Sequence, residues 1–154
     1  MIVEILTYLY LLAVAVLVGK VVFMSFVAAP VFVQTLNADA FARLVRLLIP
    51  RYYALGMIAA TVGWASVTGL GLLNGFGPWA LIAATLWLGV LAIETYCRSP
   101  LTPRINALSD QLKDAGQDGA NVVPVRKDRD ALHRRAVQLN GVALILGLCL
   151  IGLI

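Results

Sequence analysis

Two charged residues of opposite sign interrupt the apolar part of this sequence. Lys20 lies within the first apolar run, and Glu94 lies near the end of the third. A lysine near the centre of a bilayer costs at least about 2.5–3.5 kcal/mol, so it usually faces the interior of a helix bundle and has a partner. Counted along helices from the centres of their runs, both residues lie in the same half of the membrane. The sequence therefore predicts an intramembrane Lys20–Glu94 charge pair.

Glu94 has an alternative partner, and Lys20 has an alternative position. Arg98 follows Glu94 by four residues, in the acid-before-base order that favours an ion pair within one helix. Lys20 could instead extend its ammonium group to the membrane interface. Side chains on a helix lean toward its N-terminus, however, which here points away from the nearer interface. The pattern leaves open whether Glu94 pairs with Lys20 or with Arg98.

Other polar residues lie close to the same membrane face. His133 is the only histidine, with Asp130 about one helical turn before it and Asn140 two turns after it. Such a stripe suits a pH-sensitive hydrogen-bond network, although a solvated structural histidine is the alternative. We expect a polar pocket at this face, with the charge pair in its depth and these residues around it: Arg51, Tyr52, Arg104, Asn106, His133 and Asn140.

No pattern typical of an enzyme occurs in the chain. It has no Ser-His-Asp order, no phosphate-binding glycine loop, no CxxC and no HExxH. Zinc sites need three or four ligands, which one histidine does not supply. We therefore expect no catalytic residues, no metal site and no cofactor.

Four long apolar runs must hold the polar residues in place. Of the 154 residues, 61% are hydrophobic and the mean hydropathy is +0.90, which excludes an ordinary soluble domain. A membrane helix needs about 20 apolar residues, and the runs are continuous instead of alternating as in a barrel strand. We predict an all-α, integral membrane, antiparallel four-helix bundle. Residues 1–154 form a single transmembrane domain, with spans at about 5–33, 54–73, 78–96 and 136–154.

The basic residues predict the orientation of the chain. Every lysine and arginine except Lys20 lies in one of two polar segments, 37–51 and 98–135. Lysine and arginine beside membrane spans are retained in the cytoplasm. We therefore expect both segments in the cytoplasm and both termini on the periplasmic side of a bacterial inner (plasma) membrane. The net charge of +4 then faces anionic lipid head groups, and we do not expect nucleic acid as a partner.

Short helices are expected in both polar segments. Between Asn37, a good helix cap, and Pro50, apolar residues share one helical face, which predicts a short interfacial amphipathic helix: Phe41, Leu44, Val45 and Leu48. Pro50 should stop this helix or bend it into the second span. Pro100 and Pro103 should end the third span. A cytoplasmic helical loop at about 98–135 should follow, with helices at 104–115 and 126–135 and a flexible joint at 116–124.

The second run is rich in small residues, which allow close approach between membrane helices: Gly56, Ala60, Gly63, Gly69 and Gly71. Tyr52 and Tyr53 directly precede this stretch and fit the aromatic belt at the cytoplasmic interface.

Three groups of residues resemble the motifs of a known family. They are FVAAPVFVQTL at 26–36 followed by LIPRYY at 48–53, PLTPRINA at 100–107, and LHRRAVQLN at 132–140. Their order and spacing resemble the transmembrane protein 205-like proteins over nearly the whole chain. The resemblance implies a small four-helix multi-pass membrane protein of largely undefined function and supplies no catalytic residues. The family often has a small or hydroxyl residue after the histidine, where this chain has Arg134 and Ala136, which weakens a hydroxyl-based site.

Three functions follow as hypotheses. The first is a non-enzymatic protein that binds or transports a small solute, ion or lipid head group through a cytoplasm-facing polar pocket. The second is a structural or assembly subunit that docks another membrane protein, or a homo-oligomer. The third is a haem-binding or metal-binding redox protein, suggested by a similar architecture in copper-resistance-type and protoporphyrinogen-oxidase-type membrane proteins. Those proteins use intramembrane histidines, which this sequence lacks.

Overall fold

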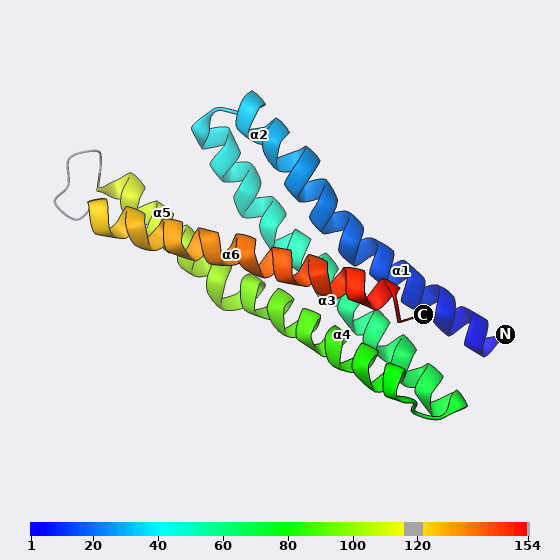
Figure 1. The fold of residues 1–154 in the computed structure, drawn as a ribbon. Coiled ribbons are helices and arrows are strands. Elements are labelled where there is room, and N and C mark those ends of the chain that lie inside the picture. Colours follow the sequence, from blue (N-terminus) through cyan, green and yellow to red (C-terminus); the bar gives the residue numbers. More distant parts are fainter. Residues whose placement is uncertain (116–121, 154) are drawn as a thin grey trace.

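The computed structural model describes residues 1–115 and 122–153, and these residues form long helices with no β-strand. Four helical segments are long and apolar enough to cross a membrane. They pack as a bundle in which consecutive segments run in opposite directions (Figure 1). The prediction of an all-α four-helix membrane bundle is confirmed.

The first segment carries Lys20 and contains a proline without ending there. It consists of α1 (Ile2–Phe23), a π-helical turn (Met24–Ala28) and α2 (Ala29–Thr35). A proline within a helix removes one backbone hydrogen bond, and its ring crowds the carbonyl group four residues earlier. The π-helical turn ends two residues before Pro30 and widens the backbone at this point. The segment therefore continues to Thr35.

The second segment is one helix, α3 (Ala38–Asn74), with Pro50 inside it. Asn37 caps its start, because Asn37 Oδ1 accepts a hydrogen bond from the backbone N–H of Ala40 at 2.8 Å. The residues before Pro50 are the first turns of α3, so the alternative in which Pro50 stops this helix is wrong, and the helix continues into the second span. Arg51 Nη1 donates to the carbonyl of Leu47 at 2.7 Å, in the turn that the proline loosens.

The third segment also passes through its prolines. It consists of α4 (Pro78–Tyr96), a second π-helical turn (Cys97–Leu101) and α5 (Thr102–Asp114). Pro100 lies inside the turn, and the Thr102 hydroxyl donates to the Cys97 carbonyl at 2.7 Å. The expectation that Pro100 and Pro103 end this helix is wrong, because the wider turn and the threonine satisfy the backbone groups that proline leaves free.

The fourth segment is α6 (Val122–Ile151), which includes the helical lead-in expected at 126–135. The joint expected at 116–124 lies outside the described residues up to position 121, and 122–124 are already helical. Arg46 pairs with Asp110, and Lys113 Nζ lies 3.1 Å from Asp39 Oδ1, so two ion pairs join the start of α3 to α5.

The four segments form a closed ring around the core. α1 packs against α3 and α6, and α4 packs against the same two helices, so α1 and α4 lie diagonally across the bundle, as do α3 and α6. Trp87 is fully buried, and its ring occupies the space that a side chain at Gly63 would fill. Tyr10 meets Trp87 edge to face, with ring centroids 5.9 Å apart, and its hydroxyl donates to the Leu150 carbonyl at 3.0 Å. Large apolar side chains cover the outside, as expected of helices that face lipid.

Figure 1 shows which chain segments share an end of the bundle. The first turn of α1 and the last turn of α6 lie at the same end as the turn between α3 and α4. In that turn Gly75 has φ +88°, a value that favours glycine. The α2–α3 connection and α5 lie at the opposite end, together with most of the basic residues.

Candidate functional site

The centre of the candidate site is an ion pair between Lys20 of α1 and Glu94 of α4. Lys20 Nζ lies 2.6 Å from Glu94 Oε1, and the side chains are 4% and 0% exposed. Because α1 and α4 are diagonal neighbours, the pair crosses the middle of the bundle. Arg98, the alternative partner of Glu94, is exposed, and its Nη1 lies 3.9 Å from Met57 Sδ. The structure therefore places Glu94 with Lys20 and not with Arg98.

Gly56 of α3 makes room for this pair. A Cβ atom at Gly56 would overlap the carboxylate of Glu94 and the ammonium group of Lys20. The backbone of α3 thus forms one wall of the site at close range, and any side chain there would displace the charged groups. From the sequence, Gly56 was expected only to allow close packing between helices. In the structure it lies against two charged groups, which its spacing alone does not reveal.

Two tyrosines of α3 form a second wall. Lys20 Nζ lies 4.0 Å from the centroid of the Tyr52 ring and 5.8 Å from that of Tyr53. Both distances are within the range of cation–π attraction. The two rings pack edge to face, with centroids 5.2 Å apart. The ammonium group therefore lies among a carboxylate, two aromatic rings and a glycine backbone.

Asn140 of α6 closes the site from the fourth side. Its Oδ1 accepts a hydrogen bond from the Tyr52 hydroxyl at 3.1 Å, and its Nδ2 donates to the Tyr53 hydroxyl at 3.2 Å. It also donates to the Ala136 carbonyl of its own helix at 3.2 Å. These bonds join α3 to α6, the second diagonal of the bundle. All four membrane segments thus contribute a polar group to one cluster, which we call the central polar cluster: Lys20, Tyr52, Tyr53, Glu94 and Asn140.

One acceptor in the central polar cluster is unused. Among the described residues, Glu94 Oε2 is buried and has no hydrogen-bond partner. A buried carboxylate oxygen without a donor is costly, so native structures usually satisfy it with protein or with a bound group. The cluster can therefore accept one further hydrogen bond at a fully enclosed position.

The other residues predicted for the pocket lie apart from this cluster. Arg104 and His133 are exposed, Asn106 is half-buried on α5, and Arg51 is exposed and bonds its own helix. The stripe expected around His133 does not form, because Asp130 pairs with Arg129 and Asn140 bonds the tyrosines. Of the predicted residues, the structure brings together Lys20, Glu94, Tyr52 and Asn140.

Sequence reasoning did not assign Tyr53, Gly56 or Cys97 to the site. Cys97 is fully buried in the apolar cluster that contains both tyrosines. The four-residue spacing of Tyr52 and Gly56 places them on one helical face, but it does not show that this face meets the ion pair. Three or more metal-ligating side chains do not gather anywhere in residues 1–115 and 122–153.

The fold and this cluster define a small multi-pass membrane protein with an ion pair buried between its helices. Residues 12–114, more than half of the chain, match the family model described as Domain of unknown function (DUF4149). The chain therefore belongs to this family, and the match includes every member of the cluster except Asn140. A search of curated proteins and a search of solved structures found no match.

Proposed function

We propose that this protein binds a small cation at the central polar cluster, as the binding step of a carrier or resistance protein. The observation that carries the proposal is the Lys20–Glu94 pair itself. The Lys20 ammonium group occupies a position bounded by a carboxylate and two tyrosine rings, which are the groups that bind ammonium-type ligands. Lys20 then acts as a tethered occupant that an incoming cation displaces.

The chemistry of the pair supports a ligand site over a purely structural role. Well-packed apolar residues of similar volume usually stabilise a protein as well as a buried ion pair does, or better. In this pair one carboxylate oxygen also lacks a donor among the described residues. A cation with N–H groups that enters beside Glu94 would satisfy that oxygen, while the released lysine would extend toward the basic end of the bundle.

The distribution of charge supports an opening toward the cytoplasm. The basic segments lie at the end of the bundle opposite the chain termini, and such segments are retained in the cytoplasm. We infer that both termini lie outside, in the periplasm of a bacterium with the protein in its inner membrane. We also infer kinship with the transmembrane protein 205-like proteins from the three motifs described above, and a non-enzymatic role from the sequence, which contains none of the catalytic motifs considered above.

Paired substitutions test the proposal. Lys20→Met leaves the Glu94 carboxylate without its partner, which should lower stability by about 3–5 kcal/mol and vacate the cation position. Thermal unfolding of purified protein is compared in ammonium, methylammonium, tetramethylammonium and sodium chloride at equal ionic strength. At least one ammonium-type salt should raise the melting temperature of Lys20→Met above its value in sodium chloride.

The double variant Lys20→Met/Glu94→Gln is the matched control, because it has the same Lys20→Met change and also lacks the carboxylate. Its melting temperature should be the same in all four salts. If Lys20→Met and the double variant respond alike to every salt, the cluster is a structural element and the proposal fails.

An assembly subunit is the second candidate, and α2 is the observation that favours it. None of the residues Ala29–Thr35 is buried, although Val31 and Val33 are large and apolar. Co-purification of a stoichiometric membrane partner that α2 substitutions release would support this candidate over the first.

A further inference from the structure

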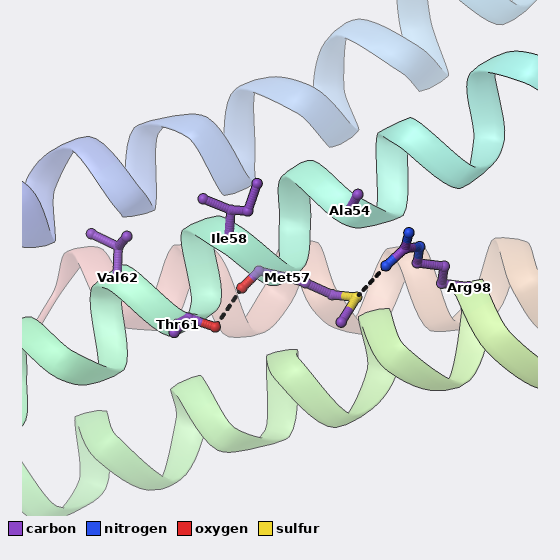
Figure 2. A pocket seen from close by; sticks show the side chains of 6 residues that line it. All are labelled: Ala54, Met57, Ile58, Thr61, Val62 and Arg98. Atoms are coloured by element: carbon purple, nitrogen blue, oxygen red, sulfur yellow. Dashed lines mark hydrogen bonds between the residues drawn. The ribbon is translucent and has the colours of Figure 1, made fainter.

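A groove follows the outer face of α3, on the side opposite the central polar cluster. It has a volume of about 390 Å³, and its lining is an apolar stripe of α3 together with one arginine of α4: Ala54, Met57, Ile58, Thr61, Val62 and Arg98. Figure 2 shows Ile58 and Val62 projecting on the side of α1, whereas Met57 extends toward Arg98 on the side of α4. The stripe repeats every three or four residues, so it is one continuous face of the helix.

The floor of this groove is apolar even where it contains a hydroxyl group. The Thr61 hydroxyl donates to the carbonyl of Met57 in its own helix at 2.8 Å (Figure 2), which leaves its methyl group for the groove. Apart from Arg98, the groove therefore offers hydrocarbon and one sulfur atom. Its lining suits an acyl chain better than a polar solute.

Arg98 lies at one end of the groove with its charge uncompensated by any described residue. Glu94, one helical turn before Arg98, already pairs with Lys20. The Arg98 guanidinium group lies beside a sulfur atom, with its Nη1 3.9 Å from Met57 Sδ. Arg98 follows Pro78, the first residue of α4, by 20 positions, which is about 30 Å along a helix and matches the thickness of the hydrocarbon core. The guanidinium group therefore lies at the level of the lipid head groups.

We propose that this groove binds one anionic phospholipid, with its phosphate on Arg98 and an acyl chain along the stripe of α3. A guanidinium group binds phosphate oxygens in a two-pronged geometry. The stripe descends from Ala54, beside Arg98, to Val62, about 12 Å deeper in the hydrocarbon, as an acyl chain does below its phosphate. The inference does not depend on cation binding at the central polar cluster.

Native mass spectrometry of the purified, delipidated protein tests this site. Dioleoyl phosphatidylglycerol and dioleoyl phosphatidylcholine share their acyl chains and differ in net charge, so we expect the first to bind more tightly. Arg98→Gln should weaken phosphatidylglycerol binding about five- to tenfold. Arg43→Gln removes the same charge from an exposed position of α3 outside the groove and should leave the affinity unchanged.

A second variant separates lipid from free phosphate. Thr61→Phe keeps Arg98 but fills the middle of the groove from an exposed position, so it should also weaken phosphatidylglycerol binding. Inorganic phosphate at millimolar concentration should not displace the lipid. Equal binding of the two lipids, equal effects of Arg98→Gln and Arg43→Gln, or displacement by inorganic phosphate would each overturn the proposal.

Discussion

A single methyl group added at Gly56 should weaken this protein, because it enters the space that the buried ion pair occupies. In Gly56→Ala the new Cβ atom overlaps the Glu94 carboxylate and the Lys20 ammonium group. Both charged side chains are buried, so neither can move aside directly into solvent. The pair must separate, or α3 must move away from α1 and α4.

The magnitude follows from two opposing effects. Breaking a buried ion pair costs about 3–5 kcal/mol. Replacing glycine by alanine within a helix gains about 0.5–1 kcal/mol, because the unfolded chain loses conformational freedom. We therefore expect Gly56→Ala to lower the free energy of unfolding by about 2–4 kcal/mol.

Gly19→Ala is the matched control for this prediction. Gly19 is adjacent to Lys20 in α1, and a Cβ atom there meets nothing within 4 Å, so the same chemical change should be neutral or slightly stabilising. Unfolding in mixed micelles with increasing sodium dodecyl sulfate, followed by tryptophan fluorescence, to which the buried Trp87 contributes, measures both variants. If Gly56→Ala and Gly19→Ala unfold at the same detergent fraction, the close approach of α3 to the ion pair does not exist.

Three further outcomes are expected. Asn140→Leu leaves the hydroxyls of Tyr52 and Tyr53 without their partner and should cost about 1–3 kcal/mol in the same unfolding assay; an unchanged midpoint would show that these bonds do not form. Arg46→Ala removes an exposed pair with Asp110 and should change stability by less than about 1 kcal/mol. A larger loss would mean that the α3–α5 contact is more buried than the structure shows. Reporter enzymes fused to the two termini should both be active in the periplasm, and activity of either one in the cytoplasm would reverse the inferred orientation.

The sequence predicted the depth of the charged residues and two of their neighbours, Tyr52 and Asn140, but not the rest of their surroundings. Lys20 and Glu94 could be matched because helix rise converts residue number into membrane depth. Their contact across the bundle depends on the order in which the four helices pack. Residue numbers alone do not give this order. Gly56 and Tyr53 come next to the pair only through this packing. From the sequence they could therefore be identified only as a small residue and an interfacial aromatic residue.

The prediction that failed concerns proline, and of the two alternatives for His133 the structure supports the solvated one. Pro100 and Pro103 were expected to end the third helix, yet a π-helical turn carries the chain past Pro100, and of the two alternatives for Pro50 the helix continues into the second span. Packing against neighbouring helices decides such cases, because it outweighs one lost backbone bond. The hydrogen-bond network along the His133 stripe does not form, because Asn140 has tyrosine hydroxyls of another helix as partners, which no spacing along α6 reveals.

The long separation of the two charged residues affects how the protein is made. Glu94 follows Lys20 by 74 residues, and ribosomes add about 5–20 residues per second. For roughly 4–15 seconds the newly synthesised first helix therefore carries a lysine whose carboxylate has not yet been translated. During that interval the nascent chain must hold its ammonium group in water or at the membrane surface, and only arrival of the third helix lets the first one settle at its final depth.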